Sequence, residues 1–469
     1  MKILFVSDQF FDANNGVTIS ARRFASILEK HGHEVRPLSV ANEGQSTYAL
    51  ETYHVPVFDK LVTKQGMKFA KWDDTNTIHD AVAWADFVHI YMPFELSKRT
   101  VMECKAQNKP FTMAFHVQPE NISSSIHMGE VKPVNDFIYW LFNKWNFQYA
   151  THIHCPSKMI ADQLKAHNYK AKLHIISNGI DPDFVYRKIP KTPELQPYFC
   201  ILTVGRYSIE KRQDILIEAV NLSKYRDKIQ LILAGQGPRK EYLEQKGEIL
   251  PVKPIMKFFT KPELLDIIAM CDLYVHASQA EIEAMSCMEA FAGGLVPIIA
   301  NSPMSATPQF ALCEESLFPV DDPNALAQRI DWWIEHEDYR KKMEVEYAES
   351  AKKYSLEACV TQAEQMFQEA IEDFNKEQKI SQKGGTNMIK TTVNIDGMAC
   401  NMCENHVCDT IREAFKVKKV RASHKNGTAE IVSEESINED ELKKAIEETG
   451  YRVLGVKIEP YVKKGLFGF

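Results

Sequence analysis

The feature that most constrains the fold is an alternation between short apolar runs and longer segments with helical periodicity. The first apolar runs are KILFVSD, HEVRPLSV, ADFVHIYMP, PFTMAFHV and THIHCPS, and a helical pattern over residues 18–31 follows the first of them. Strands and helices that alternate at this spacing are typical of a doubly wound parallel sheet, whose two faces are both covered by helices. We therefore predict an α/β domain of the Rossmann-like kind over residues 1–175.

A second series of the same kind begins near Phe199. Its apolar runs are FCILTVGR, IQLILAGQG, MCDLYVHAS and LVPIIA, again separated by segments of helical length. We expect a second Rossmann-like domain over residues 176–355, with a hinge in HIISNGIDPDF, and a closing helix over 356–378 that packs back toward the first domain. Because ligands of such sheets bind at the carboxyl ends of the strands, the crevice between the domains is the expected site.

The pattern changes after residue 378. Residues 379–387 are polar and carry Lys and Gly, so they have little to bury and are expected to form a linker. From Met388 the sequence reads as a strand, a helix, two strands around an Asn-Gly turn, a helix and a strand. This βαββαβ order predicts a small α+β, ferredoxin-like domain over residues 388–469.

Composition limits the classes of function. The chain has 469 residues, 45% apolar and 25% charged, which is too long for a single hydrophobic core. Its formal net charge of −7 argues against a general nucleic-acid binder, so we expect no nucleic-acid partner. Long apolar runs are missing from the sequence, which predicts a cytoplasmic protein, at most peripheral on the inner face of a membrane. The ten cysteines are expected to be reduced.

Cations and glycines follow the strands of the second series. Arg206 comes directly after FCILTVG, and Lys211 follows one short loop later. Two cations at the carboxyl end of a strand suit a diphosphate, although a solvated basic loop explains the spacing equally well. Gly235 and Gly237, in LILAGQGP, permit close approach of the backbone to a ligand, which is a weak signal taken alone.

The first domain offers one glycine-bearing loop of its own, in DANNGVTISARRF. Gly16 is expected to lie in a loop before a helix that Thr18 caps. The amide groups at the start of such a helix, together with the helix dipole, favour an anion.

Two acids, Glu281 and Glu289, lie eight positions apart in HASQAEIEAMSCMEAFAGG. A helix is expected over residues 284–292 with Gly293 as its C-cap, which places Glu289 inside the helix and Glu281 in the loop before it. An acid in a mostly apolar helix indicates a buried carboxylate that binds a hydroxylated partner; a salt-bridged core acid is the alternative.

In this order the motifs resemble the glycosyltransferases of family 4, which are retaining enzymes with the GT-B fold. The resemblance covers roughly residues 1–378 and rests on the NGV loop, SNGID, VGR with Lys211, AGQGP and the E-x7-E pair. It implies that Arg206 and Lys211 neutralise the leaving diphosphate and that Glu289 holds the nucleotide ribose. It also implies that Glu281 lies beside the donor sugar and that His116, in FHVQPENI, is the active-site histidine. A UDP-sugar would be the donor, and no divalent metal would be required.

One departure from the family pattern concerns the residues after the first acid. The family usually has Gly-Phe-Gly there, whereas this chain has Ile282, Glu283 and Ala284. Backbone contacts to the sugar or phosphates are therefore in question, and Glu283 is an alternative to Glu281 as the acid on the donor side.

Two stretches of the first domain bear on the acceptor. HVPVFDKLVTKQGMKFAKW mixes lysines with apolar residues, and NDFIYWLFNKWNFQYA is rich in aromatics. Such segments suit an anionic membrane interface. The plainer explanations are a surface loop whose lysines extend their apolar stems toward water, for the first stretch, and a core helix, for the second. The first half resembles bacterial diacylglycerol glucosyltransferases, which implies transfer of glucose from UDP-glucose to a lipid. Two alternatives stay open: a GDP-mannose-dependent mannosyltransferase, and a non-catalytic metal-responsive scaffold that keeps a sugar-nucleotide fold.

The last domain contains a pair of cysteines, Cys400 and Cys403, in GMACNMCENHVC. They fall at the start of a helix, where the helix dipole favours thiolate, and two thiolates without further ligands suit Cu(I) better than a structural Zn²⁺. Cys408 is expected to point into the core. The segment from Met388 to about Pro460 resembles the heavy-metal-associated domains, which implies Cu(I) binding and a copper-transport protein as partner.

Overall fold

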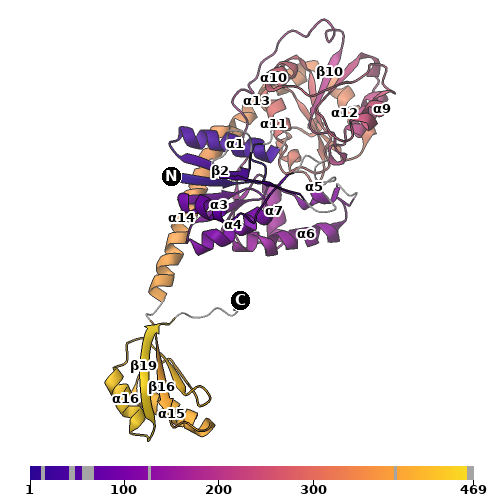
Figure 1. The fold of residues 1–469 in the computed structure, drawn as a ribbon. Coiled ribbons are helices and arrows are strands. Elements are labelled where there is room, and N and C mark those ends of the chain that lie inside the picture. The colour runs from indigo at the N-terminus through magenta and orange to yellow at the C-terminus, as the bar shows by residue number, and fades with distance from the viewer. Residues whose placement is uncertain (12–15, 42–47, 55–67, 125–127, 385–387, 462–469) are drawn as a thin grey trace. The chain divides into compact units, whose positions relative to one another are not determined.

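The computed structural model describes residues 1–11, 16–41, 48–54, 68–124, 128–384 and 388–461 (Figure 1). These residues form two compact units, Met1–Ile371 and Glu372–Phe469, and each unit is described by itself. No helix among the described residues has both the length and the apolar character needed to cross a lipid bilayer.

The first half of the first unit contains a seven-stranded parallel sheet. Its order is β3 (Tyr48–Leu50), β2 (Glu34–Val40), β1 (Lys2–Val6), β6 (Phe87–Ile90), β7 (Phe111–Ala114), β8 (His152–Cys155) and β9 (Lys172–Ile175). Side chains of β1 alternate between two cores: Leu4 and Val6 contribute to one, and Ile3 and Phe5 to the other. A strand that is buried on both faces reads as a continuous apolar run, which is why this sheet was visible in the sequence.

Helices cover both faces of this sheet (Figure 1). They are α1 (Gly16–Lys30), α3 (Thr75–Trp84), α4 (Glu95–Ala106), α5 (Pro119–Ser124), α6 (Lys132–Trp145) and α7 (Lys158–Ala166), with a short hairpin of β4 (Thr52–Tyr53) and β5 (Phe69–Ala70) beside them. Asp74 and Ser157 cap α3 and α7 by accepting hydrogen bonds from the amides of Thr77 and Ile160.

The second half of the first unit repeats the architecture. Its six parallel strands run in the order β12 (Ile255–Lys257), β11 (Ile229–Ala234), β10 (Phe199–Val204), β13 (Leu273–His276), β14 (Pro297–Asn301) and β15 (Leu317–Pro319). The helices are α8 (Gln213–Leu222), α9 (Lys240–Gly247), α10 (Lys261–Met270), α11 (Met285–Ala292), α12 (Pro323–Glu335) and α13 (Glu337–Ala351). Two doubly wound sheets in tandem confirm the predicted fold class.

The chain passes between the two halves twice, and the two crossings are adjacent. Ile180 and Ser355 form an isolated parallel bridge, in which the amide of Ile180 donates to the carbonyl of Tyr354 at 2.8 Å. The long helix α14 (Leu356–Gly384) then packs its residues Val360 and Phe367 into the core beneath α1 of the first half. Paired crossings of this kind are the natural place for a hinge.

The second unit holds, after the end of α14, a four-stranded antiparallel sheet and two further helices. The elements are β16 (Ile389–Asp396), α15 (Asn401–Ala414), β17 (Lys419–Ser423), β18 (Thr428–Ser433), α16 (Glu439–Glu447) and β19 (Arg452–Pro460), and the strand order is β17-β18-β16-β19. The βαββαβ succession confirms the predicted ferredoxin-like unit. Its core includes Cys408 and Ile411 of α15.

Candidate functional site

The N-terminal ends of α1 and α11 meet between the two halves. A Cβ placed on Gly16 would lie 3.3 Å from Cε of Met285, the first residue of α11. The prediction that Thr18 caps α1 is wrong, because α1 begins at Gly16 and Thr18 lies inside its first turn, where its hydroxyl donates to the carbonyl of Gln9 at 2.6 Å. The free amides of two helix ends therefore border one space, which favours an anion there.

The two predicted phosphate-binding cations differ in their surroundings. Arg206 follows β10 directly, and its side chain is exposed. Lys211 is largely buried and forms an ion pair with Glu281. Its methylene groups pass over Gly205, where an added Cβ would lie 3.7 Å from Cδ and Cε. Arg206 is thus open to a ligand. Lys211 is held in place by Glu281, the acid that the sequence analysis placed beside the donor sugar.

Gly235 and Gly237 are required by the packing of two loops. A Cβ on Gly235 would lie 1.9 Å from the carbonyl oxygen of Gly205, and a Cβ on Gly237 would lie 2.6 Å from that of Tyr207. The loops after β10 and β11 also exchange backbone hydrogen bonds, such as that from the Tyr207 amide to the Gln236 carbonyl at 3.0 Å. These glycines therefore fix the shape of the loop that carries Arg206, which explains them without a ligand.

Glu281 is buried in the segment after β13, among positive or polar partners. Besides the Lys211 ammonium, Nε2 of His276 lies 3.2 Å from its Oε1. Burial by itself would raise the pKa of Glu281, but Lys211 and His276 outweigh this effect and hold the pKa well below its usual range. Burial likewise opposes a charged Lys211, yet Glu281 raises the pKa of that ammonium. Both groups are therefore ionised at neutral pH.

Glu283, two residues further on, is bound to the segment that passes between the two halves. Its Oε2 accepts hydrogen bonds from the backbone amide and the Nδ2 of Asn178, each at 2.8 Å, and Asn178 in turn accepts one from Ser20 of α1 at 2.7 Å. Burial raises the pKa of Glu283 to about 7. Ala284 follows in the left-handed region with φ of 69°, at the position where the family pattern has glycine.

Glu289 lies on α11 and points to the other half of the unit. Nη1 of Arg23, on α1, donates to its Oε1 at 2.9 Å. Arg23 Nε also lies 3.4 Å from Asp181, which is paired with Lys261 at 2.8 Å. The carboxylate predicted to hold a ribose is thus engaged by a residue that the sequence analysis did not single out.

His116 belongs to a buried polar cluster at the carboxyl ends of the first sheet. Its ring stacks on Tyr91 with centroids 5.5 Å apart, and His154 packs against it edge-on at 5.1 Å. Burial holds the pKa of His116 well below its ordinary value, so the ring is neutral. Nε2 of His116, the hydroxyl of Tyr91 and Oδ2 of Asp8 are among the buried polar atoms of the described residues that have no hydrogen-bond partner. Because buried polar atoms are nearly always paired, such a cluster indicates a place for a polar ligand.

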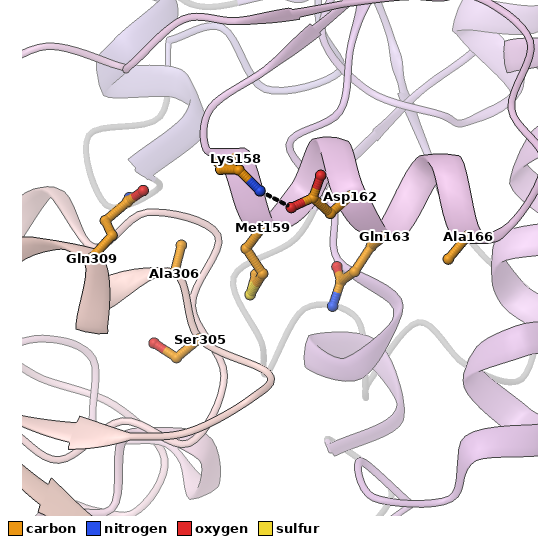
Figure 2. Close-up of a pocket in the computed structure, with 8 residues that line it drawn as sticks. All are labelled: Lys158, Met159, Asp162, Gln163, Ala166, Ser305, Ala306 and Gln309. Atoms are coloured by element: carbon orange, nitrogen blue, oxygen red, sulfur yellow. Dashed lines mark hydrogen bonds and ion pairs between the residues drawn. The ribbon is translucent and has the colours of Figure 1, made fainter.

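A pocket of about 480 Å³ lies beside this region, also between the halves (Figure 2). Figure 2 shows α7 on one side, with Met159 and Gln163 directed toward the segment that bears Ser305 and Ala306 on the other. That segment adjoins Glu281, since the Ala306 amide donates to the Glu281 carbonyl at 2.9 Å. None of the predicted site side chains lines the pocket.

The second unit presents Cys400 and Cys403 at the start of α15. Their sulfur atoms are 3.7 Å apart, Cys400 is exposed, and Cys408 is buried in the core. The backbone amide hydrogen bond at Ala399 and the hydroxyl of Tyr451 lower the pKa of Cys403 to about 7. A thiolate is therefore accessible near neutral pH, which is the state that binds soft metals.

Two family profiles cover the first unit. The one described as Glycosyltransferase Family 4 matches residues 14–184, and the one described as Glycosyl transferases group 1 matches residues 186–353. The first unit therefore consists of two glycosyltransferase domains, one of family 4 and one of group 1. Residues 392–452 of this glycosyltransferase match the Heavy-metal-associated domain.

Several relatives and solved structures are similar to this chain. An alpha-monoglucosyldiacylglycerol synthase of Streptococcus pneumoniae is 23% identical over 64% of the glycosyltransferase and 71% of the relative. A GDP-mannose-dependent alpha-mannosyltransferase of Corynebacterium glutamicum is 23% identical over 79% and 89%. Sucrose-phosphate synthase of Thermosynechococcus elongatus superposes with a TM-score of 0.63 at 15% identity, over 80% of this chain and 100% of that one, which confirms the GT-B fold. The catalytic domain of a cholesterol-alpha-glucosyltransferase from Helicobacter pylori is 48% identical over 34% of this chain and 99% of that one, with a TM-score of 0.33.

Sequence reasoning on this glycosyltransferase missed four residues of the site region. Asp8 and Tyr91 lie at the ends of β1 and β6, and Arg23 and His276 contact the two acids. The first two directly follow apolar strand runs, a signal that could have found them. Nothing in the sequence distinguishes Arg23 from its neighbour Arg22.

Proposed function

We propose that the first unit transfers glucose from UDP-glucose to a lipid hydroxyl, such as that of diacylglycerol, with retention of configuration, at an anionic membrane surface. The observation that supports a lipid acceptor is the outer face of α6. Phe137, Trp140 and Trp145 are 57%, 54% and 46% exposed and recur at helical spacing with Leu141. The opposite face of the same helix fills the core through Tyr139 and Phe142.

The aromatic stretch combines the two alternatives that its sequence suggested, a core helix and a membrane-facing surface. One side of α6 packs into the core, and the other presents an exposed row of aromatic side chains. Lys132 and Lys144 at its two ends are exposed and add positive charge, although Lys132 is paired with Asp136 at 2.8 Å. Aromatic side chains between lysines are typical of helices that lie in the interface of an anionic bilayer. The other basic stretch falls largely on residues 55–67, outside the described residues.

The donor would occupy the crevice between the halves. The exposed Arg206, the Lys211 ammonium and the amides at the starts of α1 and α11 would stabilise the negative charge that develops as the nucleoside diphosphate leaves. Glu281, ionised beside Lys211, would lie next to the donor sugar, and the neutral His116 would donate to or accept from a sugar hydroxyl. Glu289 would bind the ribose after exchanging part of its contact with Arg23. These positive groups make a divalent metal unnecessary in the proposed reaction.

A transfer assay tests the proposal. The full chain is incubated with UDP-glucose, UDP-galactose or GDP-mannose and with anionic vesicles that contain diacylglycerol, cholesterol or neither, each with and without EDTA. We expect an EDTA-insensitive α-glucolipid only with UDP-glucose and diacylglycerol. Transfer to cholesterol alone would show that the acceptor is a sterol and not diacylglycerol, but still a lipid. Absence of transfer to either lipid would refute a lipid acceptor.

Two other functions remain candidates and are decided by the same assay. The mannosyltransferase relative spans a larger share of the chain than the glucosyl relative, which favours including GDP-mannose as a donor. Product from GDP-mannose alone would establish that activity. Binding of a sugar nucleotide without turnover would favour a non-catalytic scaffold.

We propose further that the second unit binds one Cu(I) through Cys400 and Cys403 and exchanges it with a copper-transport protein. The sulfur separation of 3.7 Å, the exposure of Cys400 and the lowered pKa of Cys403 support this role. In competition with a chromogenic Cu(I) chelator, the parent chain should retain one copper. The double variant C400S/C403S should retain none, while the C408S control should bind like the parent. Equal retention by the double variant would exclude these two ligands.

A further inference from the structure

Three metal-ligating side chains outside the transferase site converge where α14 crosses the edge of the first sheet. His152 opens β8, His174 lies in the neighbouring edge strand β9, and Glu369 lies on α14. One donor atom from each lies within 4.8 Å of the other two. The grouping follows from the register: His152 is paired with Lys172 and His154 with His174, so positions 152 and 174 share a face, and α14 covers that face.

The two imidazoles already form a close nitrogen pair. Nδ1 of His152 is 2.9 Å from Nε2 of His174, one nitrogen donating and the other accepting, and the rings stack at 22° with centroids 5.1 Å apart. Oε2 of Glu369 lies 3.8 Å from the same Nε2. A tetrahedral ion with ligand bonds of about 2.0–2.1 Å separates its donor atoms by about 3.3 Å. The two nitrogens therefore need to separate by only a few tenths of an ångström, while the carboxylate, within 4.8 Å of both, would move toward them to complete the set.

We propose that His152, His174 and Glu369 form a Zn²⁺ site that fastens α14 to the edge of the first sheet. Two imidazoles and one carboxylate are a common donor set for this ion, and a water molecule would complete it. On binding, the proton shared by the two rings moves, by exchange with solvent, to the other nitrogen of the ring that carried it, so that both imidazoles stay neutral.

Lys172 is the competitor of the metal in this arrangement. Its ammonium is paired with Oε1 of Glu369, and both side chains are half-exposed. The lysine thus neutralises the carboxylate in the metal-free protein and opposes a second cation. Removing its charge should strengthen metal binding, whereas removing a ligand should abolish it. This pair of opposite effects distinguishes a metal site from an ordinary hydrogen-bonded cluster.

The position of the site gives it a consequence for the chain. Glu369 is in the last turn of α14 that packs on the first unit, next to the buried Ala370 and three residues before the second unit begins at Glu372. The apolar contacts of α14, such as Phe367, hold the helix without an ion. Bound Zn²⁺ would add a cross-link at the point where the helix leaves the first unit, and would stabilise it by mass action.

The experiment uses the full chain with C400S/C403S, so that the thiolates do not capture the ion. Calorimetric titration with Zn²⁺ and the visible absorption of Co²⁺ should both show one site per chain. H174Q and, separately, E369Q should weaken binding at least tenfold, and K172M should strengthen it several-fold. H79Q, which removes an exposed histidine paired with Glu103 elsewhere, should bind like the parent.

Thermal unfolding separates loss of the site from loss of the fold. Zn²⁺ should raise the melting temperature of the parent and of H79Q, and leave that of E369Q unchanged, while all three melt alike in EDTA. E369Q alters a partly exposed side chain, so it should fold even where H174Q does not. Absence of stoichiometric Zn²⁺ in the parent, or unchanged affinity in E369Q, would overturn the proposal. The test does not depend on the transferase activity.

Discussion

Arg23 of α1 and Glu289 of α11 join the two halves of the first unit through a bond of 2.9 Å between Nη1 and Oε1. Only 17% and 12% of these side chains are exposed. Burial raises the pKa of Glu289, and the arginine opposes that rise. A residue of the opposite half therefore favours the ionised form of the carboxylate proposed to bind the ribose, so donor binding and contact between the halves depend on the same group.

Replacing Arg23 with methionine should weaken both donor binding and the contact between the two halves. The buried carboxylate loses its partner, which should lower the free energy of unfolding by about 1–3 kcal/mol. The pKa of Glu289 should rise further, so a larger fraction of its carboxyl group is protonated at pH 6 than at pH 8. UDP binding should therefore weaken more at pH 6. Denaturant unfolding and UDP titration at the two pH values measure these effects. R22M, which changes the exposed neighbour, should alter neither, and a pH-independent loss in R23M would contradict the argument.

The fold could be predicted from the sequence, whereas the contacts within the site could not. The apolar strands of both sheets and the E-x7-E pair were recognisable because burial on two faces and helix periodicity leave a local pattern. The bond from Arg23 to Glu289 spans 266 positions, and that from Asn178 to Glu283 spans 105. Such pairs depend on how the halves pack, and no local spacing encodes them. The capping role given to Thr18 failed for a similar reason, because its hydroxyl binds Gln9 on another segment.

Glu281 and Glu283 should respond differently to the same substitution. E281Q removes the charge opposite Lys211 at the proposed donor sugar, and we expect the turnover rate to fall about 100-fold or more with little change in UDP affinity. E283Q keeps an oxygen for Asn178 and should retain at least a tenth of the activity. Steady-state kinetics with varied donor measures both. Full activity of E281Q together with an inactive E283Q would exchange the two assignments.

The protonation of Glu283 should make stability depend on pH. Its pKa in the folded protein is about 7, above the ordinary value of 4.5, so the folded state holds a proton that the unfolded state has lost between these values. The stability from this group is fully present below about pH 4.5 and is lost as the pH rises through 7. Between pH 5 and 8 the parent should lose about 2–3 kcal/mol relative to E283Q in urea unfolding. The exposed E218Q should follow the parent at every pH, and parallel curves for parent and E283Q would disprove the shift.

The exposed stripe on α6 should govern attachment to lipid. The triple variant F137S/W140S/W145S removes the aromatic face but leaves Tyr139 and Phe142 in the core, so the fold should persist. Sedimentation with anionic vesicles should show at least a tenfold loss of binding, and transfer to a short-chain, soluble acceptor should be unaffected. F258S removes a phenylalanine that is 52% exposed in the second half and should bind like the parent. Equal vesicle binding by the triple variant would remove α6 from the proposal.

Ala284 allows a test of the departure from the family's glycine pattern. With φ of 69°, its backbone occupies a region that costs a residue with a Cβ about 1 kcal/mol and costs glycine almost nothing. A284G should therefore leave stability unchanged or raise it by up to about 1 kcal/mol, because relief of this strain offsets the greater freedom of glycine in the unfolded chain. Ala280, buried in the same loop, has no positive φ, so A280G should lower stability by about 1 kcal/mol. Denaturant midpoints at one pH compare the two directly. If both variants are destabilised alike, the alanine at 284 is not strained, and the loss of glycine there has been accommodated by a change in the loop.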